Sequence, residues 1–108
     1  MTLHHAQALL SAGQTVVCHC QRDVELVEWA KKRGLYTYCG RPSMWGNPYA
    51  LRNEAQRQAV IVQYEAWLGS QPHLIRLVGS LRGRLLGCWC APKACHCDVL
   101  ARLALAQE

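Results

Sequence analysis

The sequence contains no apolar run that approaches the roughly 20 residues needed to cross a lipid bilayer. Its opening, MTLHHAQALLSAGQ, contains no lysine or arginine, so the basic start of a secretory signal is absent. Internal repeats, low-complexity tracts and long linkers are absent as well. These absences predict a cytoplasmic protein without a membrane anchor, whose thiols stay reduced.

Acidic residues are scarce relative to basic ones, because seven Asp and Glu stand against twelve Lys and Arg. The net charge of +5 favours anionic partners, such as a phosphorylated small molecule, a nucleotide or a nucleic acid. The alternative is a moderately basic surface that has no specific anionic partner. The basic residues are spread along the chain, which argues against a dedicated basic tail.

The length and the cysteine content limit the architecture. A chain of 108 residues, of which 51% are hydrophobic, predicts one globular domain spanning residues 1–108. The seven cysteines are an odd number and four of them lie within residues 88–97, so a closed disulfide framework is not expected. Metal binding, catalysis and burial remain as roles for the thiols.

Apolar periodicity, together with the positions of glycine and proline, predicts that strands and helices alternate along the chain. Strands are expected at residues 15–20, 35–39 and 84–90. Helices are expected at residues 2–11, 23–33, 53–68 and 95–106, and another begins at Pro72 and is broken by Gly83. This order predicts an α/β fold, a small three-layer, Rossmann-like domain with a short, mainly parallel sheet.

The segment GCWCAPKACHCD, residues 87–98, combines four cysteines, a histidine and an aspartate. Side chains alternate along a strand, so Cys88 and Cys90 share one face, and Cys90 lies at the carboxyl end of the strand. Open α/β sheets bind their ligands at that end. Cys95 and His96 fall at the start of the last helix, where the helix dipole lowers the pKa of a thiol.

Three interpretations of this segment remain open. The first is a zinc site formed by Cys88, Cys90, Cys95 and His96, with Cys97 as a substitute ligand, although the spacing differs from the paired C-x2-C of common zinc ribbons. The second is a catalytic site with Cys90 or Cys95 as nucleophile, His96 as base or acid, and Asp98 as the group that orients His96. The third is that the thiols are buried and Asp98 accepts backbone N–H groups at the helix start.

Three segments, CGRPSMWGNPY, RQAVIVQYEAWL and LRGRLLGCWCAPKACHCDVLARLA, resemble a bacterial and phage family known only as a domain of unknown function. The signatures of that family are GR-x-S-x-WGNP and GCWC-x-P-x-x-CHGD-x-L. The resemblance covers about residues 36–104 and implies family membership without an activity. Cys97 stands where the family pattern has glycine, so it is not expected to be a ligand common to the family.

The loop that carries the first signature supplies a second set of candidates. If the second and third strands are parallel, the loops at residues 41–47 and 90–98 leave the same sheet edge and face one cleft. Arg41 suits a phosphate or carboxylate, Asn47 an amide or base edge, and Trp45 a stacked ring. Ser43 belongs to the same candidate ligand-binding set. Core packing is the alternative for Trp45, and a salt bridge, for instance to Asp98, is the alternative for Arg41.

These observations predict a protein that binds, and in one reading processes, a phosphorylated nucleoside-type ligand or a nucleic-acid end at a Cys/His/Asp site. The alternative is a non-catalytic module, stabilised by zinc, that binds nucleic acid or a protein partner.

Overall fold

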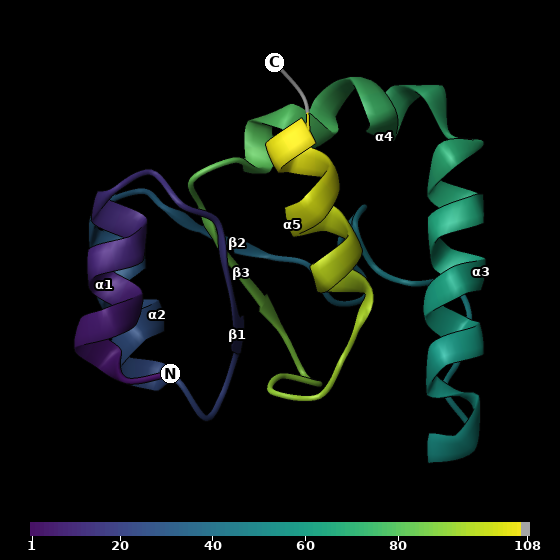
Figure 1. Cartoon of the computed structure of the whole chain (residues 1–108), viewed down its shortest axis with the longest axis horizontal. Coiled ribbons are helices and arrows are strands. Elements are labelled where there is room, and N and C mark those ends of the chain that lie inside the picture. The colour runs from purple at the N-terminus through teal and green to yellow at the C-terminus, as the bar shows by residue number, and fades with distance from the viewer. Residues whose placement is uncertain (107–108) are drawn as a thin grey trace.

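Three short parallel strands form the centre of the fold (Figure 1). The computed structural model describes residues 1–106. Strand β3 (Leu85–Cys88) lies between β1 (Val16–His19) and β2 (Tyr36–Tyr38) and pairs in parallel with both. The predicted parallel sheet is therefore confirmed, and the loops after β2 and β3 leave the sheet at the same edge.

Helices cover the two faces of the sheet. Helices α1 (Leu3–Ser11) and α2 (Val24–Lys32) lie on one side, and α5 (His96–Ala106), α3 (Arg57–Gly69) and α4 (Pro72–Leu77) lie on the other (Figure 1). Alternation along β3 connects the two layers, because Leu85 packs with the α1–α2 cluster and Leu86 with the α5 cluster. The α/β layering is confirmed, whereas the Rossmann-like assignment stays a prediction.

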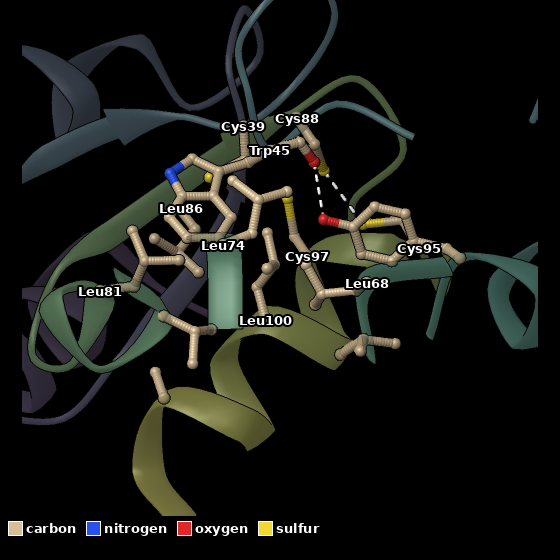
Figure 2. Packing of buried hydrophobic residues seen from close by; sticks show 14 residues of the cluster. Cys39, Trp45, Leu68, Leu74, Leu81, Leu86, Cys88, Cys95, Cys97 and Leu100 are labelled. Atoms are coloured by element: carbon tan, nitrogen blue, oxygen red, sulfur yellow. Dashed lines mark hydrogen bonds between the residues drawn. The ribbon is translucent and has the colours of Figure 1, made fainter. Parts of the chain in front are cut away.

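The larger core cluster of buried side chains lies between the sheet and helices α3, α4 and α5. Its fully buried side chains include Tyr64 and Leu68 of α3, Leu86 of β3 and Leu100 of α5. Burying one such leucine contributes about 1.5–3 kcal/mol. The Tyr64 hydroxyl donates a buried hydrogen bond to the Trp45 carbonyl at 2.8 Å, which ties the loop after β2 to α3 (Figure 2).

The element boundaries differ from the predictions at several helix ends. The predicted helix at residues 53–68 begins with a separate 3-10 turn, Glu54–Gln56, and the Asn53 side chain makes no cap hydrogen bond. The helix that starts at Pro72 continues after Leu77 as the 3-10 segment Val78–Leu81. Asp23 precedes α2 as predicted, but its carboxylate accepts the His19 N–H at 2.8 Å instead of capping the helix.

Two further expectations concern the chain as a whole. All seven cysteines are free thiols in the structure. Within residues 1–106, no helix is both long and apolar enough to pass through a membrane.

Candidate functional site

The loops after β2 and β3 meet in one pocket of about 160 Å³, which we call the edge pocket. The first loop contributes Gly40, Arg41 and Asn47, and the segment after β3 contributes Trp89, Cys90 and Cys95. The remaining lining residues come mainly from α3, the loop before it and the start of α5: Tyr49, Leu51, Arg57, Val60, Ile61, Cys88 and His96. The predicted meeting of the two signature loops across one cleft is therefore confirmed.

The charges around the edge pocket are mainly positive. Arg41 is exposed and forms no ion pair within residues 1–106. Arg57 donates from Nε and Nη2 to the Glu54 carboxylate, both at 2.8 Å, and from Nη1 to the Ala94 carbonyl at 2.9 Å. The Lys93 ammonium lies 3.4 Å from the same carboxylate. Arg57 and Lys93 thus share one carboxylate, and together with Arg41 they leave the surroundings of the pocket with a positive balance.

Hydrogen bonds explain the pKa values of this charged group. The hydrogen bond from Arg57, with a smaller contribution from Lys93, lowers the pKa of Glu54 to about 2. The same contact with Glu54, followed by a contact with Cys90, raises the pKa of Arg57 above its ordinary value. Arg57 therefore stays charged and lies beside the half-buried Cys90 thiol.

The backbone of the loop after β2 fixes the position of Arg41. A Cβ added at Gly46 would lie 2.9 Å from Cγ and 3.0 Å from Cα of Arg41, so residue 46 has no room for a side chain unless Arg41 moves. The Tyr38 hydroxyl donates to the Arg41 carbonyl at 3.0 Å. The loop therefore holds the backbone of Arg41 in place at the pocket.

The other loop candidates divide between the core and the pocket. Trp45 is 3% exposed and packs in the larger core cluster, so the packing alternative describes it (Figure 2). Asn47 lines the edge pocket, and its Oδ1 accepts the Tyr49 N–H at 2.9 Å. Ser43 is not among the lining residues, and its Oγ is buried without a hydrogen-bond partner in the described part of the chain. Ligand-binding roles for Ser43 and Asn47 stay predictions.

Three buried thiols meet beneath the pocket, and we call them the thiol cluster: Cys88, Cys95 and Cys97. Their sulfurs lie within 4.8 Å of one another, and the Cys88 and Cys95 sulfurs are 3.2 Å apart (Figure 2). In a tetrahedral zinc site with Zn–S bonds of about 2.3 Å, the sulfurs are about 3.8 Å apart. The sulfur–sulfur distances in the cluster, from 3.2 Å up to at most 4.8 Å, span that value, so the cluster could hold a metal ion.

This cluster differs from the ligand set predicted from the sequence. Cys97 joins Cys88 and Cys95, whereas Cys90 and His96 lie outside the group. His96 is committed elsewhere, because its Nε2 lies 2.7 Å from the Cys39 carbonyl oxygen. A carbonyl only accepts, so Nε2 carries the hydrogen and Nδ1 is the nitrogen that can take a proton. His96 would have to give up this bond to reach a metal through Nε2.

The three thiols of the cluster shift one another's pKa values in opposite directions. The S–H groups of Cys95 and Cys97 donate toward the Cys88 sulfur and lower the pKa of Cys88. The pKa of Cys95 is raised because its S–H acts as donor to Cys88, and that of Cys97 is raised first by its contact with Cys39. By contrast, Cys18 lies outside the cluster, and burial raises its pKa to about 12.

Asp98 has a structural contact at the start of α5. Its Oδ2 accepts the Cys95 N–H at 3.0 Å, which is the side chain-to-backbone bond of a helix cap. This contact confirms the capping alternative, and Asp98 is not among the residues that line the edge pocket. Its effect is to fix the backbone of Cys95, and a role in orienting His96 stays a prediction.

Three residues of the edge pocket with polar or aromatic side chains were not among the sequence candidates: Arg57, Tyr49 and Trp89. Trp89 is 54% exposed, yet its Nε1 donates to the Tyr38 hydroxyl at 2.8 Å and its ring meets the His19 ring edge to face at 6.0 Å. The GCWC signature pointed to Trp89. Arg57 carried no local signal, because only the packing of α3 brings it to the pocket.

A larger hollow of about 490 Å³ lies between α1, β1 and the start of α2. Its charged lining residues, Arg22, Asp23 and Glu25, are of both signs, and it contains none of the thiol cluster. Basic residues and thiols come together at the edge pocket instead, which makes the smaller cavity the candidate site.

The fold and the site define a small α/β protein with a basic pocket over a cluster of thiols at the carboxyl edge of a parallel sheet. The model of a family described as a domain of unknown function, DUF4326, matches residues 24–106, and the chain belongs to this family. The match begins upstream of the predicted core at 36–104 and includes α2. Comparison with curated proteins and with solved structures gave no match.

Proposed function

We propose that the edge pocket binds the phosphate of a nucleoside-type ligand or of a phosphorylated nucleic-acid end. The observation that carries this proposal is that Arg41 and Arg57 both line the pocket, whereas no carboxylate of residues 1–106 does. Guanidinium groups bind phosphate through paired, charge-assisted hydrogen bonds. Arg41 in particular has no ion-pair partner within residues 1–106 and is free to receive such an anion.

The aromatic side chains at the pocket support a nucleoside as the rest of the ligand. Trp89 and Tyr49 line the pocket with rings that are 54% and 38% exposed. Trp89 is held by Tyr38 and His19, so its ring is fixed before a ligand arrives. Because 160 Å³ is below the roughly 300–1,000 Å³ of typical ligand pockets, the phosphate end enters and the base stacks outside against a ring.

Replacing Arg41 by alanine is expected to weaken the binding of adenosine 5′-monophosphate, measured by calorimetry, by about 10- to 100-fold, the value of a lost charge-assisted hydrogen bond. The matched control is Arg52→Ala, which removes the same charge from an exposed residue that does not line the pocket. An equal loss of affinity in both variants would show that the effect comes from the net charge of the protein and not from Arg41 in the pocket. An absence of binding by the unmodified protein would refute the proposal.

Processing of the bound ligand is the second part of the proposal. Cys90 is the candidate nucleophile, because its half-buried thiol lines the pocket beside Arg57. His96 contributes Nδ1 as the candidate base, since Nε2 donates a hydrogen bond to the Cys39 carbonyl. Alkylation of Cys90 by iodoacetamide, followed by peptide mass spectrometry, is expected to be fast and to slow when the nucleotide is present. A thiol that reacts no faster than free cysteine removes this part of the proposal.

The thiol cluster favours a second candidate function, a zinc-stabilised module that binds nucleic acid or a protein partner without catalysis. Elemental mass spectrometry of protein purified with reductant is expected to find about one zinc per chain. The zinc is expected to be lost in Cys97→Ala and kept in Cys18→Ala, which removes an equally buried thiol outside the cluster. Free thiols are also what a reducing, cytoplasmic location maintains.

A further inference from the structure

We propose that a metal ion held by the thiol cluster keeps one coordination position open to the edge pocket and binds an oxygen of the anionic ligand there. This inference rests on the proposed function, in which the pocket holds a phosphate. It turns the two candidate functions into parts of one site. The thiol cluster anchors the metal, and the two arginines hold the part of the anion that the metal does not contact.

The position of the cluster carries the first step. Cys88 and Cys95 line the edge pocket, whereas Cys97 does not and is fully buried. An ion bonded to all three sulfurs therefore borders the pocket on the side of Cys88 and Cys95. Cys97 and the core lie behind it, so the pocket is the direction from which an external ligand reaches the ion.

The number of protein donors carries the second step. Within residues 1–106, the group of sulfurs close enough to share an ion has three members, and zinc sites with three protein ligands take an exchangeable fourth ligand. Two groups beside Cys97 have other hydrogen-bond partners. His96 Nε2, 3.9 Å from the Cys97 sulfur, donates to the Cys39 carbonyl, and the Cys39 thiol, which contacts Cys97, lies 3.6 Å from the Thr37 carbonyl. Neither belongs to the group of sulfurs that lie within 4.8 Å of one another.

Charge balance carries the third step. Three thiolates around a divalent cation leave a net charge of −1, which by itself repels an anion. Arg41 and Arg57 line the same pocket and supply two positive charges. These charges exceed the net charge of −1 on the metal and its thiolates, so they make the approach of a phosphate oxygen favourable.

Cobalt(II) in place of zinc makes the open position visible, because its ligand-field absorption bands change when a ligand is exchanged. Titration of the cobalt-loaded protein with inorganic phosphate is expected to shift these bands. Arg41→Ala is expected to raise the phosphate concentration required by about tenfold or more, while Arg52→Ala leaves it unchanged. Before phosphate is added, the bands of Cys39→Ala are expected to be the same as those of the unmodified protein, since Cys39 is not a ligand in this proposal.

The possible failures are distinguishable when calorimetry is run on the same samples. Phosphate that binds without moving the bands shows a closed metal site, which overturns this inference and leaves the proposed function standing. Phosphate that does not bind at all overturns both. Protein that forms no cobalt–thiolate bands has no metal at the cluster, and the inference fails while the arginine pocket is unaffected. Bands that change in Cys39→Ala make Cys39 the fourth ligand and also overturn the inference.

Discussion

Zinc is expected to raise the free energy of unfolding by about 4 kcal/mol when free zinc is held about a thousandfold above its dissociation constant. The physical reason is that the three sulfurs come from β3 and from the start of α5, and they meet only in the folded chain. An ion that binds the folded form alone shifts the unfolding equilibrium by mass action. Urea denaturation with reductant, with zinc and then with a chelator, measures the difference.

Two cysteine variants separate the cluster from the loss of any buried thiol. Cys97→Ala is expected to unfold at the same urea concentration with zinc and with chelator, because two sulfurs remain. Cys18→Ala loses a comparably buried side chain but is expected to keep the full zinc-dependent increase. Unmodified protein that is no more stable with zinc than with chelator would contradict the metal centre.

Tyr64→Ala is expected to lower the free energy of unfolding by about 3–5 kcal/mol, the cost of removing a large aromatic side chain from a packed core. Tyr64 is fully buried in α3, and its ring meets the His96 ring edge to face at 5.0 Å. Burial also raises the pKa of its hydroxyl, which therefore stays protonated and donates to Trp45. The variant thus loses packing around His96 together with the bond that ties the loop after β2 to the core.

Tyr64→Phe isolates that hydrogen bond, because the ring is kept. It is expected to cost about 1–3 kcal/mol, since the Trp45 carbonyl loses its donor in a buried position. The matched control is Tyr49→Phe, in which the same hydroxyl is removed from an exposed residue and stability is expected to change little. A Tyr64→Phe protein that unfolds at the wild-type urea concentration would show that the loop is held by packing alone.

Much of the fold follows from local sequence signals. Gly34, which has φ of +67°, ends α2 where the pattern places the end, because only glycine adopts that conformation without strain. The apolar run at residues 84–90 predicts the strand β3, which helices cover on both faces. The 3-10 turn Glu54–Gln56 before α3 was not predicted, and the Asn53 side chain makes no cap hydrogen bond there.

The sequence predicted where the site lies but not all of the residues that form it. The parallel order of β2 and β3 brings Arg41 and Asn47 to the same pocket as Cys90 and His96, which strand polarity alone foretells. Cys97 was predicted only as a substitute ligand, because it departs from the family pattern, yet its position on α5 puts it beside Cys88 and Cys95. Arg57 was missed for a related reason: its neighbours depend on how α3 packs, and neither length nor periodicity encodes that.

The central position of β3 has a consequence for how the protein is made. In the described chain, β1 and β2 do not pair with each other, and Val16 and Tyr36 both find their partner in Leu85. On the ribosome, the first two strands therefore stay unpaired until residues 85–88 have been synthesised. Cys88 ends β3, and Cys95 and Cys97 follow within a few residues. The sheet and the thiol cluster are consequently completed at nearly the same point of synthesis.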